Sequence, residues 1–74
     1  MRTMAEAPFV SIVVPTRDGG ARLAPCLDSV LACSYPSERR EILVVDNVPR
    51  TSATSDFLEE RYGDQVRYLR EDVP

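Results

Sequence analysis

The stretch from Val10 to Gly20, VSIVVPTRDGG, contains the feature that decides the fold. Val10 to Val14 is a short run rich in β-branched residues, which is typical of a strand. Pro15 is predicted to end this strand, because proline has no N–H to donate to a sheet. A hydroxyl, a guanidinium, a carboxylate and two glycines follow within the next five positions. The stretch therefore predicts a buried strand that carries polar groups directly into a loop.

After this loop, apolar residues recur at the spacing of an α-helix. The positions i, i+3, i+4, i+7 and i+8 form one stripe on a helix, and they are occupied by Leu23, Cys26, Leu27, Val30 and Leu31. Pro25 is compatible only with the first turn of this helix. Cys26 is interpreted as a small core residue. Cys26 and Cys33 are predicted to be free thiols, because seven residues of helix separate them by about 10.5 Å, beyond the ~7 Å limit for a disulfide.

Three further segments complete the pattern. Ile42 to Val45 is a second continuous apolar run and predicts a second strand. Asp56 and Glu59 have the spacing of a capping box, and Gly63 is a natural stop. A second helix is therefore predicted from Asp56 to Gly63. The apolar face of this helix would consist of Phe57, Leu58 and Tyr62. Val66 to Leu69 predicts a third short strand, and Arg39-Arg40 and Glu59-Glu60 are interpreted as solvated surface.

The predicted fold class is α/β, with the element order β-α-β-α-β. Strands that are apolar on both faces are typical of a parallel sheet covered by helices. Right-handed crossovers between parallel strands in the order 3-2-1 would place both helices on one face. We therefore expect part of a doubly wound, Rossmann-like three-layer sandwich, with an uncovered sheet face that is open to self-association. Residues 1–8 are expected to form a flexible leader, and residues 9–74 an incomplete domain.

Composition excludes several functional classes. The 74 residues include nine arginines but no lysine and no histidine. This removes the P-loop lysine, the Schiff-base lysine and the histidine base of a hydrolytic triad. A net charge of -3 without a basic stripe argues against nucleic-acid binding. Because there is no apolar signal core and no run near the ~20 residues of a membrane span, we expect a cytoplasmic chain with no transmembrane segment.

Polar residues follow the first two strands at their carboxyl ends. Ligands of open α/β sheets bind outside these ends, where the strand order reverses. Pro15, Thr16 and Arg17 leave the first strand and Asp46 leaves the second, so a nucleotide would lie across them. The sequence has neither a dinucleotide fingerprint nor a P-loop, so recognition would depend on the base and the ribose. There, the carboxylate of Asp46 would accept a ring N–H or a sugar hydroxyl.

Structural interpretations of the same residues stay open. Asp46-Asn47 could be a turn capped by its own side chain. Asp18-Gly19-Gly20 could be a turn and the start of a helix. Arg17 could be a solvated cation as readily as a phosphate contact.

The ordered set of motifs in VSIVVPTRDGGARLAPCLDSVLACSYPSERREILVVDN resembles the start of the inverting family 2 glycosyltransferases, which have the GT-A fold and use nucleotide-diphospho-sugar donors. The resemblance extends from about Phe9 to the end of the sequence. It implies that Pro15 and Arg17 line the nucleobase pocket and that Asp46 hydrogen-bonds the base. It also implies that later segments hold a divalent metal, Mg²⁺ or Mn²⁺, and the catalytic base. This chain is therefore expected to contain no catalytic residue and no metal ligand.

Two functions are consistent with these features. The first is a glycosyltransferase fragment that contributes to binding a nucleotide-sugar donor, with transfer and inversion carried out by a complete protein that could associate with a membrane. The alternative is a non-catalytic module, either a nucleotide-binding remnant or a small interaction domain that associates with itself through its uncovered sheet face.

Overall fold

A computed structural model describes residues 8–73 and contains one three-stranded parallel sheet. The strands are β1 (Val10–Thr16), β2 (Arg40–Asn47) and β3 (Arg67–Glu71), and β2 lies in the middle. Read from the β3 edge, this order is 3-2-1. The predicted leader, apart from its last residue, lies outside the described residues.

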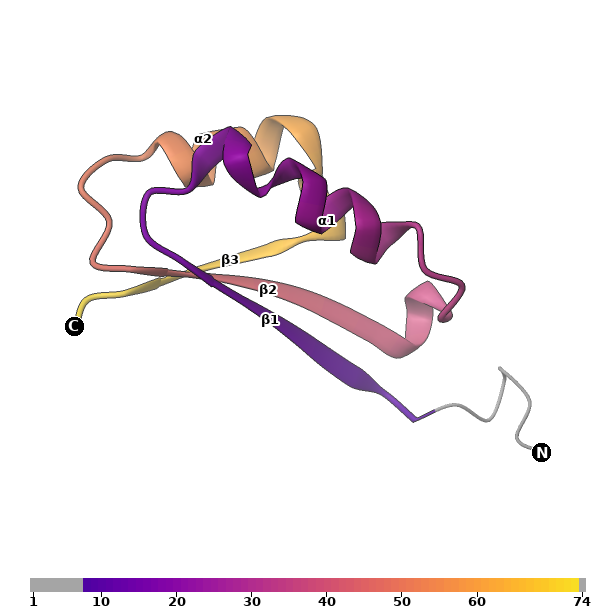
Figure 1. The fold of residues 1–74 in the computed structure, drawn as a ribbon. Helices are drawn as coiled ribbons and strands as arrows, with labels where there is room; N and C mark the ends of the chain where they lie inside the picture. The colour runs from indigo at the N-terminus through magenta and orange to yellow at the C-terminus, as the bar shows by residue number, and fades with distance from the viewer. Residues whose placement is uncertain (1–7, 74) are drawn as a thin grey trace.

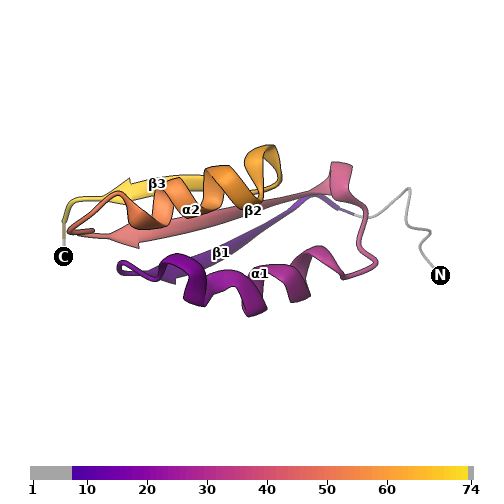
Figure 2. The same ribbon diagram turned by 90° about the horizontal axis from the view of Figure 1, so that it is seen from above.

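Two helices, α1 (Ala24–Leu31) and α2 (Ala53–Arg61), lie on the same face of the sheet (Figure 1). Seen from above, α2 lies over β2 and β3, and α1 runs along the β1 side (Figure 2). The predicted α/β class, with parallel strands and connecting helices, is confirmed. Within residues 8–73 the helices form a single layer, so the third layer of the expected sandwich is not part of the described structure.

The core lies between the sheet and the two helices. Its buried apolar members are Leu27, Ile42, Val44, Leu58, Tyr62 and Val66. From the predicted stripe of α1, only Leu27 is fully buried, and its partners at the edge of the core are Leu23, Val30 and Leu31. The predicted core position of Cys26 is wrong, because this side chain is exposed. Each helical residue is rotated by about 100° from the one before, so with Leu27 at the centre of the stripe Cys26 turns towards solvent.

Both cysteines are free thiols, as predicted, but α1 is shorter than the spacing argument assumed. It ends at Leu31, so Cys33 follows the helix. The first turn of the helix contains Pro25, as expected, and the four-residue 3-10 turn η2 (Gly20–Leu23) precedes it.

β1 continues two residues past Val14, where the predicted strand ends. Pro15 lies inside the strand opposite Val45, and Thr16 pairs with Asp46. The sheet tolerates this proline because β1 is an edge strand in the described residues and Pro15 is exposed. The two extra residues bring the ends of β1 and β2 closer to the same level.

The predicted cap of α2 is also displaced. The helix begins at Ala53, and Ser52 occupies the capping position. The Ala53 N–H donates to Thr51 Oγ1 at 3.2 Å, and Ser52 Oγ donates to Asp56 Oδ2 at 2.9 Å, which places Asp56 in the first turn rather than at the cap. Gly63, with φ +55°, follows the helix as predicted.

The second face of the sheet carries exposed apolar residues. Val13 is 56% exposed and Leu69 is 41% exposed, and no helix of residues 8–73 covers them (Figure 1). Towards the amino ends of the strands this face becomes polar. There, Ser11 Oγ donates to Glu41 Oε1 at 2.6 Å and Arg67 pairs with Glu41 at 3.4 Å.

Candidate functional site

The four candidate residues of the sequence lie at one edge of the sheet, where β1 and β2 end. Thr16 stands opposite Asp46 in the parallel register, directly after Pro15. Arg17 follows in the loop and is exposed, whereas Thr16 is half-buried. The structure therefore brings Pro15, Thr16, Arg17 and Asp46 together, as parallel strands with level ends must.

Asp46 is the most deeply buried of these residues, with an exposure of 0%. Its Oδ1 accepts the backbone N–H of Asp18 at 2.9 Å, and its Oδ2 accepts the hydroxyl of Tyr68 at 2.9 Å. These partners lie 28 and 22 residues away, so Asp46 joins three separate segments and does not cap a local turn. Burial, followed by the bond to Asp46, raises the pKa of Tyr68 to about 12.

Asp18 connects the loop after β1 to the loop after β2. Its carboxylate oxygens accept the backbone N–H of Arg50 at 3.0 and 3.2 Å, and the Arg50 Nε lies 3.7 Å away. Its carbonyl accepts a hydrogen bond from Arg22 Nη2 at 3.2 Å. The φ of Asp18 is +53°, in a region that residues other than glycine rarely adopt. Several contacts therefore hold this residue in an unfavourable conformation.

The two glycines beside Asp18 are needed for different reasons, a close approach at Gly19 and a positive φ at Gly20. A Cβ added to Gly19 would lie 2.3 Å from Thr16 Oγ1 and 3.0 Å from Leu23 Cγ. Gly20 has φ +53°, and its N–H donates at 3.0 Å to Oγ1 of Thr54, a fully buried residue of α2. The interpretation of Asp18-Gly19-Gly20 as a turn and the start of a helix agrees with Gly20 opening η2.

The loop after β2 also contains an unusual backbone. Val48 has φ +49°, which is uncommon for a β-branched residue, and its N–H donates to the Glu71 carbonyl at 2.6 Å. The side-chain amide of Asn47 donates to the Val73 carbonyl at 3.0 Å. Backbone strain of this kind persists only where surrounding contacts enforce it, and it is most common near functional sites.

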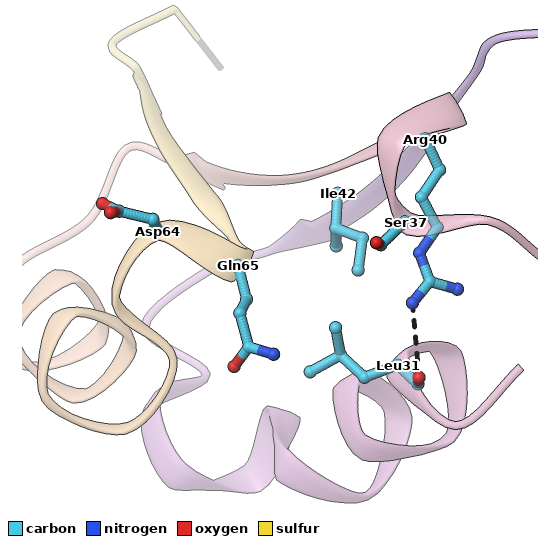
Figure 3. Close-up of a pocket in the computed structure, with 6 residues that line it drawn as sticks. All are labelled: Leu31, Ser37, Arg40, Ile42, Asp64 and Gln65. Carbon is cyan, nitrogen blue, oxygen red and sulfur yellow. Dashed lines mark hydrogen bonds between the residues drawn. The ribbon is translucent and has the colours of Figure 1, made fainter.

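A pocket of about 420 Å³ lies at the opposite end of the sheet (Figure 3). It is lined by Leu31, Ser37, Arg40, Ile42, Asp64 and Gln65. Arg40 donates to the carbonyls of Val30 at 3.1 Å and Leu31 at 3.3 Å, so its guanidinium caps the carboxyl end of α1. The interpretation of Arg40 as ordinary solvated surface is therefore wrong. The pocket that Arg40 lines is separate from the predicted site at the carboxyl ends of β1 and β2.

Sequence reasoning missed Tyr68 and Arg50 as parts of the candidate site. Tyr68 was detectable, because the alternation of a strand places it on the same face as the buried Val66 and close to the helix-covered side. The contact between Arg50 and Asp18 spans 32 residues and depends on the positive φ of Asp18, which the sequence pattern does not reveal.

Residues 8–73 contain neither a metal-binding cluster nor a membrane-spanning helix. No group of at least three His, Cys, Asp or Glu side chains in this range could hold a metal ion. No helix in the same range has the length and the apolar character needed to cross a membrane.

Comparison with known proteins gave concordant matches. A family model described as "Glycosyltransferase like family 2" matches residues 7–73. Two proteins described as uncharacterized glycosyltransferases, from Rickettsia bellii and Rickettsia felis, are 31% and 32% identical to this chain over 65 residues, which is 88% of the chain and 9% and 10% of those proteins. Glycosyltransferase AglE of Haloferax volcanii is 40% identical over 40 residues, 54% of this chain and 13% of that protein. The chain thus spans about a tenth of the length of these curated relatives.

Proposed function

Because the chain belongs to the glycosyltransferase like family 2, we propose that it forms the donor-binding part of a glycosyltransferase and holds a nucleotide-diphospho-sugar at the carboxyl ends of β1 and β2. The observation that carries this proposal is the level pairing of Thr16 with Asp46 within the family-matched region. Open α/β sheets bind nucleotides at this position.

Each residue of the edge has a distinct role in the proposal. Pro15 and Thr16 line the base and ribose, and the exposed guanidinium of Arg17 approaches the base or the phosphates. Asp46 accepts a ring N–H of the base. A carboxylate oxygen has two acceptor positions, and each oxygen of Asp46 uses one for a protein donor, which leaves one for a ligand. Since Asp46 is 0% exposed, ligand contact requires the neighbouring side chains to move aside.

The proposed reaction is sugar transfer with inversion, carried out by the complete protein. An acceptor hydroxyl oxygen forms a bond to the anomeric carbon from the side opposite the donor phosphate. The bond to that phosphate breaks, the nucleoside diphosphate leaves with the electron pair, and a base takes the hydroxyl proton. The base and the metal that the family resemblance implies are assigned to no residue of this chain.

The proposal is tested by calorimetric titration of uridine diphosphate into the complete protein and into its Asp46→Asn variant. Asn presents an N–H₂ donor in place of one carboxylate oxygen, so the ring N–H loses a charged acceptor. We expect affinity to fall about ten- to a hundredfold, which corresponds to a charge-assisted hydrogen bond of about 1.5 to 3 kcal/mol. Asp28→Asn, on the exposed side of α1, serves as the matched control. Equal affinity in the folded Asp46→Asn protein would remove Asp46 from the binding site.

A second candidate function rests on the uncovered sheet face. Val13 and Leu69 are 56% and 41% exposed on that face. A non-catalytic module that associates with itself would bury these side chains against a second copy, because exposed apolar strands at a sheet favour association. Nucleotide binding by the complete protein together with a monomeric chain would favour the glycosyltransferase proposal over this one.

A further inference from the structure

Tyr68 reaches the candidate site from the strand most distant from the loop after β1. It lies on β3, and its hydroxyl donates to Asp46 Oδ2 at 2.9 Å. The other oxygen of Asp46 accepts the Asp18 N–H at 2.9 Å. A single buried carboxylate thus joins Tyr68 to the backbone of the loop that carries Arg17.

The loop depends on this bond because its backbone is unfavourable. Asp18 has φ +53°, a conformation that aspartate adopts more readily than most residues other than glycine but that still costs free energy unless contacts compensate. One contact is the bond from Asp18 N–H to Asp46, and another is the bond from Arg50 N–H to the Asp18 carboxylate. The bond from Asp18 N–H to Asp46 requires the Asp46 carboxylate to keep its orientation.

Tyr68 fixes that orientation. Asp46 is 0% exposed, so in the folded chain its Oδ2 has the Tyr68 hydroxyl rather than bulk water as hydrogen-bond partner. Within residues 8–73 no buried side-chain nitrogen or oxygen lacks a hydrogen-bond partner, so Tyr68 completes the polar contacts beneath the site. A buried polar group that loses its partner reorients or costs free energy.

We propose that Tyr68 is a positioning residue for the donor site: through Asp46 it holds the segment Thr16 to Gly20 in the conformation that receives the nucleotide. This inference rests on the proposed function. In this proposal Tyr68 acts through the orientation of Asp46 and not by contact with the donor. The other oxygen of Asp46, Oδ1, accepts the backbone N–H of Asp18, and this second bond connects Tyr68 to the loop.

The test compares Tyr68→Phe with Tyr62→Phe in the complete protein. Tyr62 offers a matched control, because its hydroxyl also donates to an aspartate, Asp28 Oδ1, at 2.8 Å, but this bond joins the two helices. The primary measurement is hydrogen exchange at the Asp18 amide. A general loss of stability in Tyr62→Phe would not accelerate exchange at this amide selectively. The second measurement is the dissociation constant for uridine diphosphate.

In Tyr68→Phe we expect exchange at the Asp18 amide to accelerate about tenfold, the factor that accompanies loss of one buried hydrogen bond, and nucleotide affinity to fall by a similar factor. Tyr62→Phe should leave both values within about twofold of the parent protein. Unchanged protection at Asp18 in Tyr68→Phe, or equal acceleration in both variants, would overturn the inference.

A third variant keeps the test decisive if Tyr68→Phe folds poorly. In Asp46→Asn the side-chain oxygen still accepts from Asp18 N–H, and the N–H₂ group donates to the Tyr68 hydroxyl, which accepts as well as donates. Protection at Asp18 should then persist while nucleotide affinity falls, and loss of protection would contradict the inference. If the parent protein binds no nucleotide, the proposed function fails, whereas exchange at Asp18 still decides whether Tyr68 positions the loop.

Discussion

The carboxylate of Asp18 holds the backbone of Arg50 through both of its oxygens, at 3.0 and 3.2 Å. The two residues lie 32 positions apart and belong to the loops that follow β1 and β2. Because the Arg50 side chain is 77% exposed, the ion pair adds little, and the backbone hydrogen bond is the contact that joins the loops. The two strand ends therefore form one connected edge.

Replacing Asp18 with alanine should separate the loops. Asp18→Ala removes the bonds to Arg50 N–H and places a residue that disfavours positive φ at +53°. We expect a loss of about 1 to 2 kcal/mol, measured by hydrogen exchange of the β2 amides in the complete protein. Asp18→Asn is the control, since asparagine tolerates positive φ and keeps one acceptor oxygen. Equal losses in both variants would show that the carboxylate contributes more than one hydrogen bond.

Hydrophobic pattern was sufficient to predict the element order and the parallel sheet. Runs such as Ile42 to Val45 are continuous, and β2 indeed lies between two strands with Ile42 and Val44 buried. Helix boundaries were less accurate. The start of α2 depends on Thr51 and Ser52, whose capping contacts compete with the capping-box spacing of Asp56.

The candidate site was predicted only in part. The positions of Pro15, Thr16, Arg17 and Asp46 at one edge follow from strand order alone. The contacts of Asp46 do not, because they involve a strand 22 residues later and a loop residue with positive φ. Long-range hydrogen bonds depend on register and side-chain rotamers, which a sequence pattern does not specify.

A methyl group at Gly19 should destabilise the loop. The added Cβ of Gly19→Ala would lie 2.3 Å from Thr16 Oγ1, so the strand end or the loop must move. We expect a loss of about 1 to 3 kcal/mol, read from hydrogen exchange of the same β2 amides. Adding Thr16→Ala removes the contacted atom and should recover part of the loss. Strict additivity of the two substitutions would contradict this steric explanation.

The uncovered sheet face should make the isolated chain self-associate. Val13 and Leu69 are exposed on this face, so we expect oligomers or aggregates by light scattering. Val13→Thr combined with Leu69→Thr lowers the apolar exposure while keeping residues suited to strands, and it should shift the population towards monomer. Val14→Thr, on the helix-covered face, should lower stability without releasing monomer. A monodisperse parent chain that unfolds cooperatively would show that the chain is stable without a partner on this face.

Alkaline pH should weaken the fold through Tyr68. Burial first, then the bond to Asp46, raises the pKa of this tyrosine to about 12 in the folded chain, with Asp18 adding to the shift and Arg70 opposing it. In the unfolded chain a tyrosine titrates near a pKa of about 10. The folded state thus holds the proton more tightly. The contribution of Tyr68 to the free energy of unfolding is therefore fully present below pH about 10 and is lost as the pH rises towards about 12.

Hydrogen exchange of the β2 amides across this pH range, after correction for the intrinsic exchange rate, measures that decline. Burial also raises the pKa of Tyr62, which contributes a decline of the same sign. Tyr68→Phe should therefore reduce the slope between pH about 10 and 12 without abolishing it. Tyr62→Phe supplies the complementary comparison, because it retains Tyr68 and its bond to Asp46. A slope in Tyr68→Phe as steep as in the parent would mean that neither burial nor the bond to Asp46 raises the pKa of Tyr68 in the folded chain, and the contact between β3 and the ends of β1 and β2 would lose its electrostatic basis.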